Sequence, residues 1–153
     1  MMTKDELIES AKKIDPPELA IAESFGAKRE MLVSRVIDSL CQRKDIDRLV
    51  GQDNITMMKD NVSNMSRFME SMFNQYAPEA YVETILWVFR AYRSHGFQLA
   101  FWSAHLNAWI ETIRSEQTDE NLNQLIPFYE WIQIHIPQFT ALTDESVSDA
   151  KSE

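Results

Sequence analysis

The sequence is poor in glycine and cysteine. Its 153 residues include three glycines and one cysteine, whereas average usage would give about ten glycines. Because Gly26, Gly51 and Gly96 are far apart, the chain can form neither the glycine-rich fingerprint of a dinucleotide-binding fold nor a phosphate-binding P-loop. Cys41 is the sole cysteine, which excludes a disulfide framework and is typical of a reducing compartment.

Long apolar runs and an excess of positive charge are also missing. No apolar stretch reaches the roughly 18 residues of a membrane span, and the first residues, MMTKDELIESAKK, lack the apolar centre of a signal peptide. We therefore expect a cytoplasmic protein. Acidic residues outnumber basic ones by 24 to 15, which gives a net charge of −9. This balance does not suit nucleic-acid phosphates or an anionic membrane surface, and we expect neither partner.

Catalytic motifs are absent as well. His95, His105 and His135 are too far apart for a zinc-protease helix, and none has a glutamate three residues before it, as di-iron bundles require. No serine lies in a Gly-x-Ser-x-Gly motif. His95 and His135 lie near the ends of predicted helices, where helix capping is the simpler role for a histidine. For His105 the simpler role is a buried structural one. The sequence does not indicate an enzyme.

Apolar residues recur at three- and four-residue spacing through most of the chain, which is the pattern of amphipathic helices. Low glycine, eight methionines and few β-branched runs favour the same class. Helices are predicted over 4–25 (two short helices), 28–42, 55–74, 78–95, 98–115 and 118 to about 136, with Thr118 as the N-cap of the last. The sequence thus predicts an all-α domain of five to seven helices.

Prolines and one glycine set the expected helix boundaries. The run Asp15-Pro16-Pro17 separates the two N-terminal helices, and Gly96 suits the left-handed position after a helix. Pro127 is expected to kink the last helix, and Pro137 is expected to stop it. A short helical turn is expected within 43–54. After residue 142 the chain reads TDESVSDAKSE, which predicts an acidic linker or solvated tail.

Methionines form a stripe along one predicted helix. Met58, Met65, Met69 and Met72 share a face with Phe73. Thioethers are soft ligands that suit copper(I), but the helical spacing favours plain core packing by an adaptable side chain. Such a deformable apolar wall also suits a pocket for a flat cofactor.

The segment FMESMFNQYAPEAYVETILWVFRAYRSHGFQLAFWSAHLNAWIETI resembles the central helices of bacterial globin-type sensor domains. It is most similar to the N-terminal globin-like domains of RsbR-type stressosome sensors, which are relatives of globin-coupled oxygen sensors. The similarity covers roughly residues 28–140. It consists of a turn from Phe73 to Tyr76, the helix from Tyr81 to His95, a Gly-Phe turn at 96–97 and an aromatic start to the next helix at Phe101-Trp102.

The resemblance implies a haem-based sensor of oxygen, another gas or redox state. In such sensors the helix that corresponds to 79–95 provides the haem-ligating histidine, and here that slot holds Tyr92. A phenolate ligand favours ferric iron. His95, three residues further on, is the alternative iron ligand. The other residues implied to surround the haem are Met58, Met65, Met69, Phe89, Trp102 and, in the slot of a hydrogen-bonding tyrosine, Ile37.

The family also includes members that keep the globin shape without haem. The alternative is therefore a haem-free regulatory module that signals through dimer packing, partner binding or an apolar ligand. Either form would be the signal-input domain of a bacterial stress-response regulator. The resemblance further implies a homodimer, and stressosome-type scaffold or antagonist proteins that are reached through a following C-terminal domain.

Three regions follow from this interpretation. Residues 1–26 form an N-terminal helical extension, 27–142 form the globin-like core, and 143–153 form the acidic linker or tail. If the domain dimerises, we expect the contact to use apolar residues left over on the N-terminal helices, namely Leu7, Ile8, Leu19 and Phe25.

Overall fold

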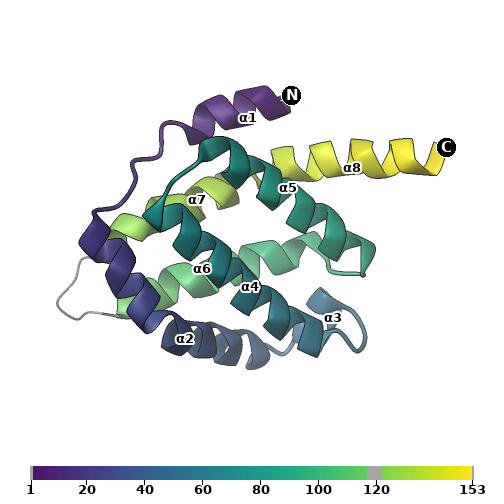
Figure 1. Cartoon of the computed structure of the whole chain (residues 1–153). Coiled ribbons are helices and arrows are strands. Elements are labelled where there is room, and N and C mark those ends of the chain that lie inside the picture. Colours follow the sequence, from purple (N-terminus) through teal and green to yellow (C-terminus); the bar gives the residue numbers. More distant parts are fainter. Residues whose placement is uncertain (1, 117–121, 153) are drawn as a thin grey trace.

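The computed structural model describes residues 2–116 and 122–152, with side chains described as far as residue 144 (Figure 1). These residues form eight α-helices and one short 3-10 helix, and they contain no strand. The elements are α1 (Lys4–Ala11), α2 (Leu19–Cys41), α3 (Ile46–Val50), α4 (Ile55–Asn74), α5 (Pro78–Ser94), α6 (Leu99–Ser115), η1 (Leu122–Leu125), α7 (Ile126–Ile134) and α8 (Ile136–Ser152). The predicted all-α class is confirmed, with more helices than expected.

Local signals explain where α1 begins and ends. The Thr3 hydroxyl accepts a hydrogen bond from the Glu6 amide, and the Glu6 carboxylate accepts one from the Thr3 amide, each over 3.2 Å. This reciprocal pair is a capping box, which satisfies two amides that the first turn leaves free. The two prolines at 16–17 lie between α1 and α2, as the sequence predicts.

α2 is one helix of 23 residues, although the sequence predicts separate helices on either side of Gly26. Glycine costs a helix only about 1 kcal/mol relative to alanine. The buried stripe of α2 runs past Gly26 without interruption, through Ile21, Phe25 and Leu32. Burying these side chains outweighs the cost of the glycine, so the helix continues.

The middle of the fold follows the prediction closely. α3 is the short turn expected within 43–54, and α4, α5 and α6 begin and end within one residue of their expected bounds. Gly96 has φ +97°. Its amide donates to the Arg93 carbonyl, and the Phe97 amide donates to the Tyr92 carbonyl, each over 3.1 Å. This pair of bonds is a Schellman cap, which confirms the left-handed position of Gly96.

The region after α6 differs from the single kinked helix that the sequence predicts. Thr118, the expected N-cap, lies outside the described residues. Pro127 does not kink a helix but lies in the first turn of α7, and Pro137 lies in the first turn of α8. A proline in the first turn breaks no helical hydrogen bond, because the amides there have no intrahelical acceptor. Both prolines therefore help to begin helices.

α8 runs through the boundary expected at residue 142, and its C-terminal part extends past the other helices (Figure 1). The expected solvated tail is instead held against the body at its first two residues. Thr143 is fully buried, and the Asp144 carboxylate pairs with Arg93 on α5. The spacing along the chain does not predict these contacts, because both residues are polar and their partner, Arg93, is 50 and 51 positions away.

The core lies between two layers of helices. α2 packs against α4 and α6, α6 packs against α7, and α5 packs against α1 and α8. Figure 1 shows α4 and α5 on one side of the body, with α6 and α7 on the other. This arrangement is consistent with a globin-like helical domain. Of the helices described, none is long and apolar enough to cross a membrane.

The N-terminal residues expected at a dimer contact are largely used inside the chain. Leu7 and Phe25 are fully buried, and the Phe25 ring meets the Phe73 ring edge-on at 4.9 Å between centroids. Leu7 and Phe25 are therefore not available to a second copy of the chain. This corrects the expectation that they form the dimer contact. Ile8 is half-buried against the core, and Leu19 is 64% exposed.

Candidate functional site

A small cavity of about 190 Å³ lies between α4 and α5. Its walls come from one face of each helix, because the lining positions recur at helical spacing. The lining residues are Asn61, Asn64, Met65 and Phe68 on α4, and Thr84, Trp87, Val88 and Tyr92 on α5. None of these eight side chains is charged, so the cavity favours an uncharged occupant.

Asn61 is the buried polar residue among those that line the cavity. Its side chain is 1% exposed, and its Nδ2 amide has no acceptor among the described residues. A buried donor without a partner costs roughly 1–3 kcal/mol, and buried amides are normally paired. Asn64, one turn away, is exposed and already accepts from Arg67 Nη1 over 3.0 Å. The buried side-chain donor without an acceptor on this part of α4 is therefore Asn61 Nδ2.

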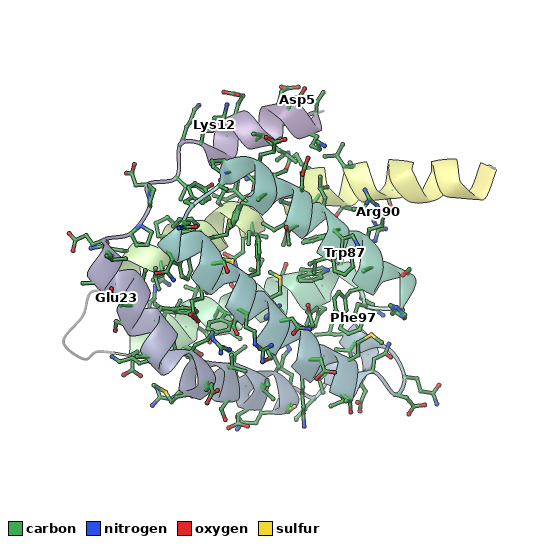
Figure 2. The ribbon with its side chains drawn as sticks, in the orientation of Figure 1. Asp5, Lys12, Glu23, Trp87, Arg90 and Phe97 are labelled. Carbon is green, nitrogen blue, oxygen red and sulfur yellow. The ribbon has the colours of Figure 1, made fainter. Side chains whose placement is uncertain are left out.

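Two aromatic residues, Trp87 and Tyr92, belong to the α5 wall. Trp87 lies on α5 (Figure 2). It is 63% exposed, whereas Trp102, Trp109 and Trp131 are buried. Tyr92 is half-buried, and burial together with the negative charge of Asp60 raises the pKa of its hydroxyl. Tyr92 therefore stays protonated, because both effects oppose a phenolate.

The remaining residues implied by the globin resemblance do not line this cavity. Met69, Phe89 and Trp102 are each 1% exposed. The rings of Phe89 and Trp102 stack with centroids 4.5 Å apart and planes 12° apart. Ile37 is a half-buried residue on α2. Of the implied haem pocket, only Met65 and Tyr92 line the cavity.

His95 has the position of a capping residue. It follows the last residue of α5, and its side chain is exposed. Its backbone carbonyl accepts a hydrogen bond from Asn54 Nδ2 over 2.8 Å. This contact connects the loop before α4 to the end of α5.

The residues at this site do not fit a haem. The cavity is smaller than the roughly 300–1,000 Å³ of sites for drug-sized ligands. The stacked pair Phe89 and Trp102 and the buried methionines Met58 and Met69 fill the interior beside it. Met58 and Met69 therefore pack the core, as the helical spacing favours. Among the described side chains, no three histidine, cysteine, aspartate or glutamate residues are grouped to hold a metal ion.

α5 is joined to α8 directly beside the cavity. Arg93 follows Tyr92, and its Nη1 donates to the Thr143 hydroxyl over 2.8 Å and to the Thr140 carbonyl over 3.3 Å. Its Nη2 pairs with the Asp144 carboxylate. The Thr143 hydroxyl in turn donates to the Phe139 carbonyl over 2.8 Å. These bonds hold the end of α5 and the middle of α8 together.

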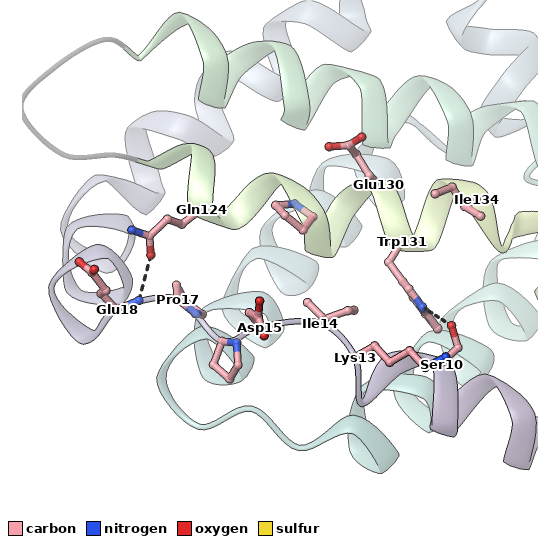
Figure 3. A pocket seen from close by; sticks show the side chains of 12 residues that line it. Ser10, Lys13, Ile14, Asp15, Pro17, Glu18, Gln124, Glu130, Trp131 and Ile134 are labelled. Carbon is pink, nitrogen blue, oxygen red and sulfur yellow. Dashed lines mark hydrogen bonds between the residues drawn. The ribbon is translucent and has the colours of Figure 1, made fainter.

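A second, larger hollow is a surface groove of about 800 Å³ between the α1–α2 connection and α7 (Figure 3). Trp131 Nε1 donates to the Ser10 hydroxyl, and the Glu18 amide donates to Gln124 Oε1, each over 3.0 Å. Both bonds span the groove and connect segments more than 100 positions apart. Sequence reasoning misses this groove, because only the tertiary fold brings its two sides together.

No family model matches this chain, and no curated protein or solved structure matches it significantly. Any function must therefore rest on the chemistry of the chain's own residues. The cavity between α4 and α5 and its bonded connection to α8 are the features that bear most directly on it.

Proposed function

We propose that this chain is a haem-free signal-input module with a globin-like arrangement of helices. In this proposal the occupancy of the α4–α5 cavity changes the position of α5, and Arg93 transmits the change to α8. The resemblance to RsbR-type sensors supports a role in a bacterial stress-response regulator, with a homodimer and stressosome-type partners reached through a following domain. The observation that best supports transmission is the bonding of Arg93 to Thr143 and Asp144.

The physical basis is the shared helix. Tyr92 lines the cavity and Arg93 is the next residue, so any displacement of this turn of α5 moves both. Packed helices shift as rigid units rather than deforming continuously. α8 extends past the body (Figure 1), where a following domain would receive the change. Coupling between two such sites is typically worth 1–3 kcal/mol.

Hydrogen exchange of the α8 backbone tests this transmission without a known ligand. Thr84→Leu partly fills the cavity, and the exchange of amides 138–143 is compared in this variant and in the parent protein. We expect a several-fold change in exchange. The change should disappear when Arg93→Met is added, because methionine preserves the aliphatic packing but none of the three bonds to α8.

Arg90→Met is the matched control, because Arg90 is an exposed arginine on the same helix (Figure 2). It should leave the response to Thr84→Leu intact. A response that persists in Arg93→Met, or no response to cavity filling, would contradict the proposed transmission.

The haem-based sensor is the less favoured interpretation, because the cavity is small and its tyrosine is held protonated. An absorption spectrum after addition of hemin separates the two. We expect no Soret band from a specific complex. A band that is lost in Tyr92→Phe or in His95→Ala would instead establish the haem-based sensor and identify its ligand.

A further inference from the structure

The groove between the α1–α2 connection and α7 is held in place by hydrogen bonds at both ends. Figure 3 shows the Glu18–Gln124 bond at one end and the Ser10–Trp131 bond at the other, each over 3.0 Å. The two walls are therefore fixed to one another, although they are more than 100 positions apart in the chain. A site whose walls are already in place loses little conformational freedom when it binds.

Both walls of the groove present apolar side chains to solvent. Ile134 on α7 is 69% exposed, and Pro127 on the same helix is exposed as well. On the opposite wall Pro16 is exposed and Pro17 is half-buried. All four residues line the groove. Exposed apolar side chains that gather around one hollow, rather than lying singly, are typical of a binding surface.

The groove is also negatively charged. Asp15 and Glu18 flank the two prolines on one wall, and Glu130 lies on α7. All three are exposed, and none forms an ion pair with a described cation. Lys13 is the one basic residue among the described residues that line the groove, so three acids against one base leave a net charge of −2. This charge favours a positively charged partner.

The backbone of the proline wall favours hydrogen-bond donors as well. Pro16 and Pro17 have no amide hydrogen, and the Glu18 amide already donates to Gln124. This stretch therefore has carbonyl oxygens to offer but no free N–H group. Lysine and arginine side chains are donors without an acceptor, so they match both the carboxylates and this backbone. The acidic end of the chain itself, TDESVSDAKSE, has the wrong charge to occupy the groove.

The open shape of the groove suits a peptide segment better than a small molecule. Sites for small ligands bury roughly 70–90% of the ligand surface, whereas the walls here consist largely of exposed residues. A peptide segment can lie along such a groove and place apolar and basic side chains against both walls.

We propose that this groove is a docking surface for a short segment of a partner protein, in which an apolar side chain lies close to a lysine or arginine. The apolar side chain packs against Ile134 and the prolines of the groove, and the basic group lies among the carboxylates of Asp15, Glu18 and Glu130. This goes beyond the signal-input role proposed above, because it gives the domain a partner of its own. It does not depend on the α4–α5 cavity.

Selection of short random peptides displayed on phage tests this proposal, with the full chain as the target. We expect the enriched peptides to combine lysine or arginine with an aliphatic or aromatic residue. The most enriched peptide is then synthesised and titrated by calorimetry against the parent protein and its variants. Its affinity should fall several-fold when the salt concentration is raised, because salt screens exposed charges.

Two variants of the groove have matched controls outside it. Glu130→Lys reverses one charge of the groove, and Glu30→Lys reverses an exposed carboxylate on α2 that does not line it. Ile134→Ser removes the exposed apolar side chain, and Met31→Ser does the same on α2. We expect each groove variant to weaken peptide binding about tenfold, and each control to retain it. All four positions are exposed, so the variants should stay folded.

Other results would overturn the inference. If no peptide is enriched, the groove does not bind peptides, and if the enriched peptides are acidic or uncharged, the assigned chemistry is wrong. Equal affinity of the parent protein, Glu130→Lys and Ile134→Ser would place the binding elsewhere. A homodimer that light scattering shows to be lost in Ile134→Ser would mean that a second copy covers the groove instead. The α8 exchange response to Thr84→Leu judges the proposed function separately, so either proposal can fail alone.

Discussion

The Trp109 indole donates from Nε1 to the Nε2 atom of His105 over 3.1 Å, across one turn of α6. His105 is 1% exposed. Because Nε2 accepts this bond, the ring is neutral and its proton resides on Nδ1. Burial lowers the pKa of His105 to about 3. This supports the structural position that the sequence indicates for His105, and it gives the fold a defined sensitivity to acid.

His105 should make the stability of the fold fall between pH 6.5 and about 3. Above pH 6.5 the ring is neutral in both states. Below it the unfolded chain binds a proton that the folded chain does not, so stability declines by up to about 1.4 kcal/mol per pH unit. Urea unfolding at pH 7 and pH 5 measures this decline. His105→Phe should be less stable at pH 7 but should show a shallower pH dependence, whereas an unchanged dependence would rule out His105 as its source.

Gly51 and Gly96 should differ in their tolerance of a side chain, although both have positive φ, +91° and +97°. A Cβ at Gly51 would lie 3.2 Å from the Gly96 carbonyl oxygen and 3.1 Å from Asn54 Nδ2, whereas at Gly96 its nearest neighbour is 4.0 Å away. We expect Gly96→Ala to cost about 1 kcal/mol from backbone strain alone.

Gly51→Ala should cost more than Gly96→Ala, because it also displaces Asn54 from the Val50 and His95 carbonyls. Denaturant midpoints of the two variants give the comparison. Equal losses would show that strain alone determines both costs.

The sequence predicts the middle helices well and the last part of the chain poorly, for a physical reason. α4, α5 and α6 are long and periodic, and α5 is bounded by Pro78 and Gly96, so their signals are local. Pro127 and Pro137 are compatible with kinking, stopping or beginning a helix. Which of these occurs depends on where α7 and α8 pack.

The candidate site could be predicted only in part. Met65 and Tyr92 belong to the apolar pattern of their helices, so sequence reasoning finds them. Asn61 is a polar residue within α4, and its burial results from the packing of distant helices. Trp87 belongs to a residue type that is usually buried, yet it is 63% exposed. Neither property can be derived from the spacing along one helix.

Gly26→Ala should stabilise the protein by about 0.5–1 kcal/mol. Gly26 lies within continuous α2, where alanine is the better helix former. Its new Cβ would lie 3.2 Å from Glu70 Oε2, which is the end of a flexible side chain. Glu70 can move slightly, although it accepts from Arg29 Nε over 2.9 Å. Thermal unfolding measures the net effect, and a decrease in stability would show that the Arg29–Glu70 pair is worth more than the gain in helix propensity.

Leu7 and Leu19 should separate the stabilising role of the N-terminal segment from any role in self-association. Leu7 is fully buried, and Leu19 is 64% exposed. Leu7→Ala should cost about 2–5 kcal/mol through a cavity in the core, whereas Leu19→Ala should change stability by less than about 0.5 kcal/mol. Urea unfolding at one protein concentration measures both.

Light scattering of variants at the same two positions tests the predicted homodimer. If the dimer uses this segment, Leu19→Glu should shift the protein towards the monomer, because the exposed leucine is available to a second copy. Leu7→Ala should leave the dimer unchanged under conditions in which it stays folded. Deletion of 1–26 cannot substitute for this test, since it removes Ile21 and Phe25 from the core and should unfold the chain. A dimer that survives Leu19→Glu but is lost in folded Leu7→Ala would contradict the intramolecular role of Leu7.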